Sequence, residues 1–587
     1  MSIATANTPP VTTRARLFRR PSTLWLAVPG ILFLAFFFAF PVARLLFLAF
    51  EDQETGTWTL AAFNRIVESD VYLHVLGITF KIAGYTALVS LLLGYPLAYW
   101  LATKPAFLRG RLLLFVMVPF WTSYLVKTFA WMIMLGRTGV VNSLLLGSQV
   151  TDRPFSLMYN EFGVMVGMVH AMVPLAAITM LPVMLNIDRR LVQAAQTLGA
   201  TPIHAFWLVY FKLSLPGVTA AGLLVFISSL GFFIVPAFLG GPQETMLAQL
   251  IIVQIQQLLN WSFAGALAML MLVTALVACW LYDLLFGIST VTGGSGKESS
   301  GTTRLIGLFV LERVAWATAW IGAAARRLVG PKVTARTLPF VTWTIIAFLV
   351  LPTLLIIPLS FTSSQFLEFP PPGWSLQWYE TYLNSPVWIA ATVRSFGVGF
   401  ATAIFATIIG GFAALALSRS RSKWGTAIFA FFLAPMIVPR IVIAVGIFYL
   451  FAQLGLVATN TGLVIGHTVL AVPFAMIAVS AILKTYDVQL DHAAATLGAN
   501  RVKTLFFVTI PLIRGGLVAA FLFAFITSFD ELTIAIFVSG GINTTLPKKM
   551  WDDMILQLNP TLAAVSVVVF LLVTAILLLA ERFRRSD

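Results

Sequence analysis

Four charged side chains fall within long apolar stretches of the sequence, where a charge is costly. They are Asp530, Glu531, Arg440 and Lys127. A charge near the middle of a bilayer raises the free energy unless it is paired or hydrated, so such residues tend to mark paths for polar solutes. A carboxylate attracts amines, whereas an Arg fork binds carboxylate or phosphonate groups through two parallel hydrogen bonds. The four side chains are therefore candidates for contact with a solute.

Each candidate has a structural alternative. Asp530 and Glu531 are adjacent, and adjacent helical residues point about 100° apart. One is therefore expected to line a path while the other pairs with protein. Both carboxylates could instead pair with Lys127 or Arg440, which would also account for Arg440. Lys127 alternatively reaches the outer membrane interface along its flexible side chain.

Aromatic and histidine side chains add fewer candidates. Trp121 and Tyr124 lie near Pro119 and offer aromatic faces to an alkylammonium group, although Trp and Tyr near a span end also serve as interface anchors. His170 and His467 have no second His or carboxylate at ligand spacing, so no metal site is expected. The sequence also lacks a paired catalytic cluster, and we expect no enzymatic activity in this chain.

The elements that carry these residues are those of a helical membrane protein. Of the 587 residues 59% are hydrophobic and 10% are charged, which is too apolar for a soluble globular protein. Apolar runs of about 20 residues recur, and each is long enough to cross a hydrocarbon core. The net charge of +15 comes largely from Lys and Arg in short loops. The positive-inside rule explains that distribution better than nucleic-acid binding does.

The apolar runs predict an all-α membrane protein of about 12 transmembrane helices, arranged as two parallel six-helix repeats. The expected spans of the first half are 24–48, 76–102, 111–136, 163–186, 217–239 and 263–287. Those of the second half are 338–361, 390–417, 425–452, 461–483, 513–538 and 561–580. Two six-span halves that begin and end on the same side insert in the same orientation.

The expected division of the chain follows from these spans. It comprises an N-terminal tail (1–23), a first half (24–288), a linker (289–337) and a second half (338–587). Both termini and the linker fall on the cation-rich side, which the positive-inside rule places in the cytoplasm. Within the linker, residues 305–328 are long enough to span, but Glu312 and Arg313 would then lie near mid-bilayer. We expect a helix at the cytoplasmic interface instead, anchored by Trp316 and Trp320.

One short stretch occurs in both halves. "QAAQTLGA" begins at Gln193 and "HAAATLGA" at His492, 299 residues later (492 − 193 = 299). Each is expected to form a short helix with small residues on one side, a Gly break and a second helix, in a cytoplasmic loop after the fourth span. Such a surface lets another backbone come close. The alternative is a tight turn packed on its own bundle, which the occurrence of two equivalent copies disfavours.

These motifs resemble the permease subunits of ABC importers, whose signature is Glu-Ala-Ala, three residues, Gly, nine residues, an aliphatic residue, one more residue and Leu-Pro. The residues that match this signature are Ala194, Ala195 and Gly199, and then Ala493, Ala494, Gly498, Val508, Ile510 and Pro511. Gln193 and His492 stand at the Glu position. The stretches "LLGYPLAYWLA", "VPFWTSYLVKTFAW", "ALSRSRSKWG", "HTVLAVPFAM" and "FITSFDELTIAIFVSG" are similar to the two permease subunits of spermidine/putrescine importers.

The resemblance implies a fused permease core in a bacterial inner membrane. It implies a periplasmic solute-binding protein and two copies of a cytoplasmic ATPase, which would bind ATP and Mg while this chain holds no cofactor. It also links an acidic pair at Asp530 and Glu531 to handling a cationic solute. Relatives tend to carry an acid where Arg440 stands, so we keep open an amine that also bears an acidic group. The alternative function is a secondary transporter driven by an ion gradient.

Overall fold

The computed structural model describes residues 23–286, 331–420, 422–541 and 543–585, together with Arg313, Trp316, Trp320 and Ala324. The N-terminal tail and the rest of the predicted helix 305–328 lie outside the described residues. Trp316 and Trp320 are both exposed, and the Trp316 ring lies 6.5 Å from that of His204. The helix that opens the second half begins at Pro331, before the predicted residue 338.

Helices occupy each predicted apolar run. The first half contains η1 (Thr23–Ala27), α1 (Val28–Leu34), η2 (Ala35–Ala39), α2 (Phe40–Leu48), α3 (Ala61–Glu68), α4 (Asp70–Thr103), α5 (Ala106–Trp121), α6 (Tyr124–Leu135), α7 (Val140–Gly147), α8 (Glu161–Leu185), α11 (Lys212–Leu230), α12 (Ile234–Leu239), α13 (Leu247–Gln256) and α14 (Trp261–Phe286). The second half contains α16 (Pro331–Leu359), α17 (Gln377–Asn384), α18 (Pro386–Ser418), α19 (Gly425–Ile437), α20 (Arg440–Leu454), α21 (Asn460–Leu483), α25 (Arg514–Phe529), α26 (Thr533–Val538), α27 (Leu546–Leu556) and α28 (Thr561–Arg585).

Several of the predicted spans are broken rather than continuous. By length and composition, 9 helices among the described residues could each cross a membrane, and 11 could if each bent pair counts as one span. The bend between α19 and α20 is 95°. The third and fifth predicted spans of each half consist of two helices, joined by a few non-helical residues. A uniform set of 12 straight spans is therefore not what the chain forms.

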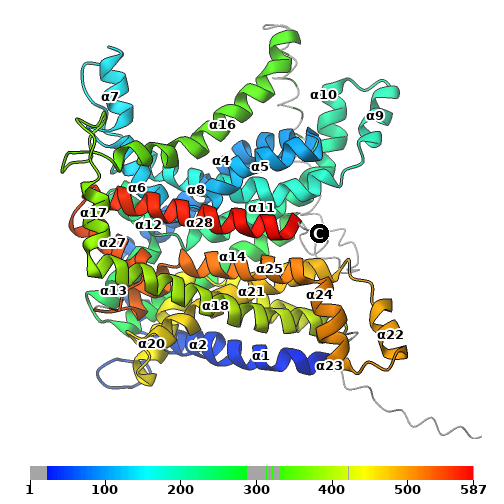
Figure 1. Ribbon diagram of the computed structural model, residues 1–587. Coiled ribbons are helices and arrows are strands. Elements are labelled where there is room, and N and C mark those ends of the chain that lie inside the picture. The colour runs from blue at the N-terminus through cyan, green and yellow to red at the C-terminus, as the bar shows by residue number, and fades with distance from the viewer. Residues whose placement is uncertain are drawn as a thin grey trace, which may run out of the picture.

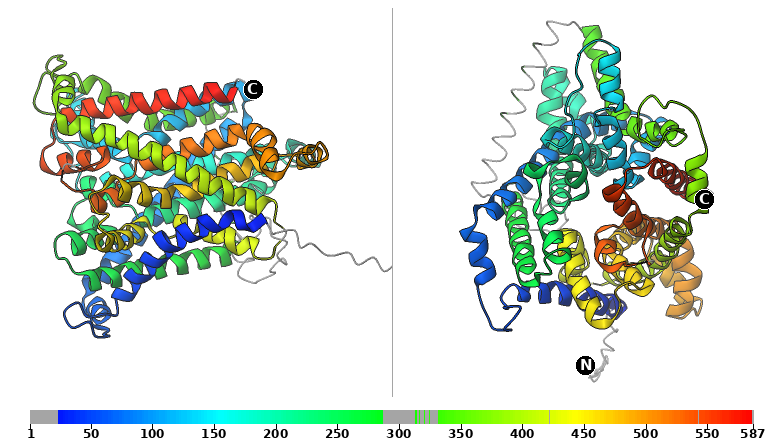
Figure 2. Two further views of the ribbon diagram at one scale, coloured as in Figure 1. Left: turned by 60° about the horizontal axis from the view of Figure 1, so that its bottom comes forward. Right: turned by 90° about the vertical axis from the view of Figure 1, so that its left-hand side faces the viewer.

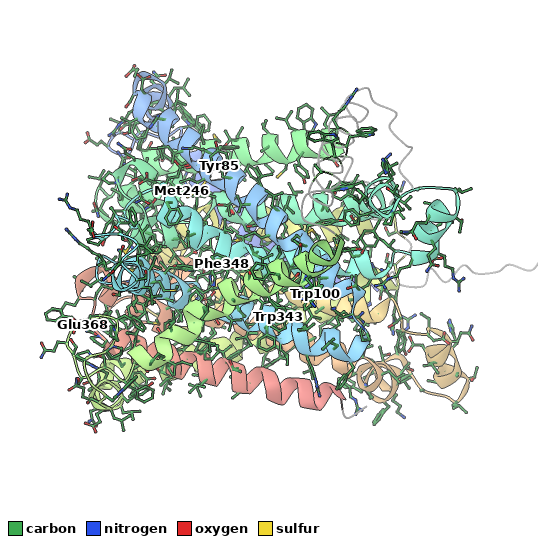
Figure 3. The ribbon with its side chains drawn as sticks, turned by 90° about the horizontal axis from the view of Figure 1, so that it is seen from above. Tyr85, Trp100, Met246, Trp343, Phe348 and Glu368 are labelled. Atoms are coloured by element: carbon green, nitrogen blue, oxygen red, sulfur yellow. The ribbon has the colours of Figure 1, made fainter. Side chains whose placement is uncertain are left out.

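The first span of each half packs on the other half. α2 contacts α20 and η1 contacts α18, so these two first-half elements lie against the second half. α16 in turn contacts α4, α5 and α6 of the first half. Figure 3 shows Trp343 of α16 beside Trp100 of α4, with ring centroids 6.0 Å apart. Figure 2 shows the helices roughly side by side along one direction, as expected for a bundle that crosses a bilayer.

Glycine permits the closest helix contacts within each half. α4 packs on α8 at Gly94, where an added Cβ would lie 3.1 Å from the Cβ of Ala176. α18 packs on α21 at the corresponding Gly410, where the Cβ would lie 2.7 Å from the backbone nitrogen of Met476. Because lipid tails are as apolar as helix surfaces, close packing of small residues is a main source of association between membrane helices.

We expect Gly410→Ala to lower the thermal midpoint of the purified protein in detergent. The new methyl group would meet the backbone of α21, and overpacking of this kind costs about 1–3 kcal/mol. Gly411→Ala is the matched control, because its Cβ would meet nothing nearer than the Leu517 side chain at 3.9 Å. Equal midpoints for the two variants would contradict the tight α18–α21 contact.

Candidate functional site

Two matching loops project from the same end of the bundle (Figure 1). Repeat loop 1 spans residues 188–205 and contains α9 (Arg189–Thr197) and α10 (Pro202–Ala205). Repeat loop 2 spans residues 487–504 and contains α22 (Gln489–Thr496) and α23 (Arg501–Thr504). Every residue of α9 and α22 is exposed or half-buried. The two loops therefore extend beyond the packed helices, as the sequence predicts for a surface that meets another molecule.

The turn inside each repeat loop has the same geometry. The chain reverses at Gly199 with φ +91° and at Gly498 with φ +84°, a backbone conformation that side chains with a Cβ disfavour. In both loops the amides of this Gly and of the following Ala donate to carbonyls three and five residues earlier, each at 3.0 Å. These bonds satisfy the last carbonyls of the first helix, so the Gly is needed for the turn itself.

The predicted residues occupy equivalent places in the two loops. Exposed positions are Gln193, Ala194 and Gly199 in one loop and His492, Ala493 and Gly498 in the other, and Ala195 and Ala494 are half-buried. Sequence reasoning missed the residue directly before each Gly. Leu198 is 88% exposed and Leu497 is 89% exposed, so each loop carries an apolar tip. A partner that docks on either loop would be able to bury this side chain.

The bases of the repeat loops are anchored to the spans in different ways. In loop 1, Arg189 Nη2 donates to the carbonyl of Ala102 at 2.6 Å. In loop 2, Arg419 at the end of α18 forms an ion pair with Asp491 at 2.6 Å. The Tyr486 hydroxyl donates to the same carboxylate at 2.6 Å. Burial raises the pKa of Tyr486, and its bond to Asp491 raises that pKa further. Each loop is thus tied at its base and exposed at its tip.

A cavity of about 170 Å³ lies between the two halves. Met172 and Leu470 line it, near the middle of α8 and α21 respectively, so the cavity lies about midway along the bundle. Of the five residues predicted to line a solute path, the cavity brings four together: Tyr124, Arg440, Asp530 and Glu531. Most of the remaining lining is apolar. Charged groups in such surroundings interact strongly with one another and with any polar molecule that enters.

Four helix breaks meet around this cavity. In each half the break in the third span faces the break in the fifth span of the other half. The amide of Tyr124, at the start of α6, donates to Asp530 Oδ1 at 3.2 Å. Gly231, at the end of α11, lies against Pro439 and Arg440, and an added Cβ would stand 3.6 Å from the Arg440 nitrogen. The pattern has approximate twofold symmetry, but only one of the two crossings contains an acid.

Asp530 and Glu531 lie in the break between α25 and α26, not within a helix as predicted. Glu531 is 1% exposed, and its carboxylate accepts hydrogen bonds from the amides of Thr533 at 3.0 Å and Ile534 at 2.7 Å. It therefore caps the start of α26. Asp530 is half-buried and faces the start of α6. Both acids line the cavity and both accept backbone hydrogen bonds, and Asp530 is the more exposed of the two.

Arg440 is the first residue of α20 and corresponds to Tyr124 in the other half. Its side chain is exposed and lines the cavity. Among the described residues it has no carboxylate within the ion-pair distance of 4.0 Å. The predicted alternative, direct pairing of Arg440 with Asp530 or Glu531, is thus not the arrangement seen.

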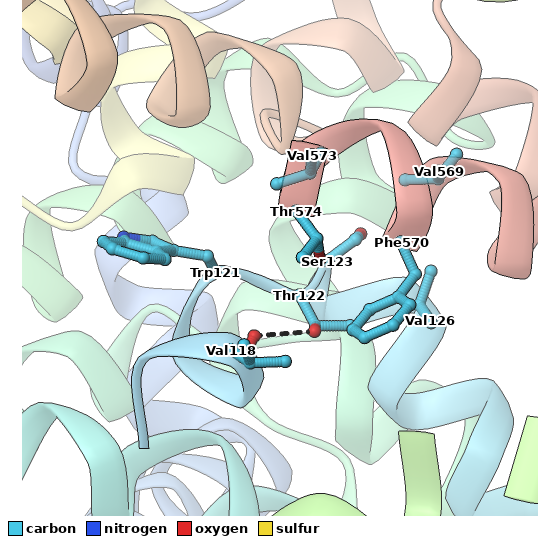
Figure 4. A pocket seen from close by; sticks show the side chains of 9 residues that line it. All are labelled: Val118, Trp121, Thr122, Ser123, Val126, Val569, Phe570, Val573 and Thr574. Atoms are coloured by element: carbon cyan, nitrogen blue, oxygen red, sulfur yellow. Dashed lines mark hydrogen bonds between the residues drawn. The ribbon is translucent and has the colours of Figure 1, made fainter. Parts of the chain in front are cut away.

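Lys127 and Trp121 lie apart from the cavity lining. Lys127 is 3% exposed and its ammonium lies 4.3 Å from the centre of the Tyr124 ring, so the expectation that it reaches the outer interface is wrong. It is close enough to interact electrostatically with Asp530. Trp121 lines a separate small space between the α5–α6 break and α28, where Figure 4 shows its ring turned away from the Thr122 and Val573 side chains. It does not share the cavity with Tyr124.

The two buried histidines serve as packing and hydrogen-bonding groups. His170 Nε2 lies 3.0 Å from the carbonyl of Leu349 on α16, and His467 Nδ1 lies 2.8 Å from the hydroxyl of Ser528. His467 Nε2 also stands 3.9 Å from Glu531 Oε2. Across the described residues, no group of three or more His, Cys, Asp or Glu side chains has the arrangement of a metal site.

Comparison with known proteins relates the chain to transport systems. Residues 94–288 and 406–586 match the family described as "Binding-protein-dependent transport system inner membrane component". The spermidine/putrescine transport system permease protein PotB of Escherichia coli strain K12 is 32% identical over 209 residues, which are 36% of this chain and 76% of that protein. The putrescine transport system permease protein PotI of the same strain is 31% identical over 229 residues, 38% of this chain and 81% of that protein.

A third polyamine permease and a solved structure are also similar to this chain. The spermidine/putrescine permease PotC of Haemophilus influenzae is 28% identical over 242 residues, 41% of this chain and 93% of that protein. A bacterial ABC transporter that imports the acidic polysaccharide alginate is similar at a TM-score of 0.38 and 18% identity, covering 44% of this chain and 92% of its own. A TM-score this low carries no weight for function.

The family match occurs twice, once in each predicted half, and together the two matches cover more than half of the chain. This agrees with the two helical repeats and with the two repeat loops at one end of the bundle. The predicted all-α fold of two repeats is confirmed, and so is the resemblance to polyamine permeases. The chain belongs to the inner membrane component family of binding-protein-dependent transport systems, with two copies of the permease unit in one polypeptide.

Proposed function

We propose that this chain is the membrane-spanning core of an ATP-driven importer for a small organic amine, either polyamine-like or zwitterionic. The observation that carries the proposal is the pair of repeat loops, which match in turn geometry, exposure and apolar tip. A homodimeric ATPase has two equivalent docking surfaces, and each of the two repeat loops of this chain can occupy one of them. ATP and Mg would be bound by those ATPase subunits, on the cytoplasmic side.

The coupling follows from where the loops are attached. Loop 1 is bonded to the end of α4 through Arg189, and loop 2 to the end of α18 through Arg419. α4 and α18 pack on α8 and α21, which line the cavity. When the ATPase subunits close, the two loops would be drawn together and the two halves would tilt about the cavity. This links the nucleotide state to access for the solute, and no bond in the solute changes.

The proposed solute is an amine because of the relatives and because of Asp530. The PotB, PotC and PotI proteins are named for spermidine and putrescine transport. In this chain Asp530 is half-buried at the cavity, where a carboxylate can attract an ammonium group. A solute-binding protein would deliver the amine to the outer face, opposite the repeat loops.

We expect Gly199→Val and Gly498→Val to abolish the ATP hydrolysis that loaded binding protein stimulates in the reconstituted complex. A β-branched residue disfavours the positive φ of these turns, while no atom outside the turn lies within 4 Å to clash with it. The control is Gly56→Val, at an equally exposed positive-φ turn with φ +67° outside the repeat loops. Stimulated hydrolysis equal to that of the parent in both loop variants would refute the docking role. Uptake on a proton or sodium gradient without any ATPase would favour the secondary-transporter alternative.

We expect substitution of Asp530 to affect mainly transport and substitution of Glu531 to affect mainly stability. Asp530→Asn should slow uptake of the amine that the binding protein carries and lower the thermal midpoint less than Glu531→Gln does, because Asp530 is half-buried beside the cavity and makes fewer backbone hydrogen bonds. Glu531→Gln should lower the midpoint, because an amide cannot accept at both ends of the α26 cap and a lost buried acceptor costs about 1–3 kcal/mol. Uptake rates and unfolding of both variants are the measurements. The same loss in both properties for both variants would show that the acids act as one structural unit.

A further inference from the structure

We propose that the cavity between the halves selects a zwitterion, with an ammonium group at Asp530 and a carboxylate or similar anionic group at Arg440. This inference rests on the proposed function and narrows its solute class. It starts from the three charged side chains that line the cavity: Arg440, Asp530 and Glu531. One cation faces two anions, but the surrounding protein compensates the three charges to different degrees.

The Glu531 carboxylate is already hydrogen-bonded within the protein. Both of its oxygens accept backbone hydrogen bonds from the start of α26, and the side chain is 1% exposed. The positive end of the helix dipole adds to this compensation. Asp530 also accepts a backbone hydrogen bond, from Tyr124, and interacts with Lys127, but it is half-buried at the cavity and so is the more accessible carboxylate of the pair.

Among the described residues the Arg440 guanidinium has no ion-pair partner, and it interacts with the charges of Asp530 and Glu531 only from beyond 4.0 Å. It is exposed to the cavity, no carboxylate lies within 4.0 Å of it, and it stands at the positive end of the α20 dipole. The facing break of the first half has Gly231 and Phe232 where the second half has Asp530 and Glu531. At the equivalent crossing an acid meets the helix start, but here nothing acidic does. The guanidinium is thus placed to bind an anionic group.

Asp530 and Arg440 line one small cavity without forming a direct ion pair. Opposite charges in an apolar cavity gain free energy when a bridging group completes their pairing. A compound with an amine at one end and an acid at the other would bridge them, and each of its charges would meet an opposite charge. A diamine would pair one end with Asp530 but bring its other cation toward Arg440, which is repulsive.

The test compares matched probes on the purified complex of this chain with its ATPase, without binding protein. ω-Amino acids with chains of three to six carbons are titrated alongside α,ω-diamines of the same lengths, and binding is followed by calorimetry and by the thermal midpoint. We expect at least one ω-amino acid to bind more tightly than every diamine. Arg440→Gln should weaken that binding at least about tenfold, the loss typical of a charge-assisted hydrogen bond. Arg440→Lys should weaken it less.

Two further variants guard against an effect of folding alone. Gly231→Asp would place a carboxylate beside the start of α20 and compete for Arg440. Gly231 has a φ of −89°, and its added Cβ would lie 3.6 Å from the Arg440 nitrogen, so the position accepts a side chain. It should reproduce the loss seen in Arg440→Gln. Arg44→Gln is the matched control, because Arg44 does not line the cavity and forms an ion pair with Glu51 at 2.9 Å. The Arg44→Gln variant should bind the ω-amino acid as tightly as the parent does.

Tighter binding of diamines than of ω-amino acids would overturn the inference, as would binding of neither series or equal affinity in Arg440→Gln and Arg44→Gln. Any of these results leaves the importer proposal standing if loaded binding protein still stimulates ATP hydrolysis by the parent complex. Loss of that stimulation in the parent complex would instead sink the proposed function itself.

Discussion

The structure depends on one constraint, which is that polar groups inside a bilayer must find partners within the protein. Each helix break exposes backbone amides and carbonyls, so a break at mid-membrane is costly unless something faces it. Here breaks face breaks across the boundary between the halves, and the Glu531 carboxylate satisfies the amides of α26. The cavity exists because these broken helices cannot pack against each other as straight rods do. The same constraint therefore produces both the opening and the charges that line it.

The repeat loops obey a different rule because they lie outside the packed bundle. Their shape is set locally, by a Gly with positive φ and by hydrogen bonds within a few residues. Local signals of this kind are legible in a sequence, so the two loops and their equivalence could be predicted from the repeated octapeptide. The apolar tips at Leu198 and Leu497 could have been found in the same stretch, since each directly precedes the Gly.

Features that depend on which helix meets which could not be predicted in this way. An apolar helix face looks the same whether it packs on lipid, on its own half or on the other half, so the exchange of first spans left no mark in the composition. The break at Asp530 carries neither Gly nor Pro, so the sequence predicts continuous helix there. Its signals were the Gly231 at the equivalent place and the acid just before a short apolar run. The position of Lys127 was mispredicted because snorkelling depends on what lies above a residue, which only the fold supplies.

The exchange of first spans has a consequence for how the protein comes into being. A ribosome delivers the chain from its N-terminus, so η1 to α2 enter the membrane while α18 and α20 have yet to be made. α2 meets α14 of its own half first, but the contacts of α2 with α20 and of η1 with α18 can form only after more than half of the polypeptide has been made. α16, by contrast, finds α4, α5 and α6 already in place as it emerges. Because both permease units lie in one polypeptide, one copy of α18 and α20 is made for every copy of η1 to α2.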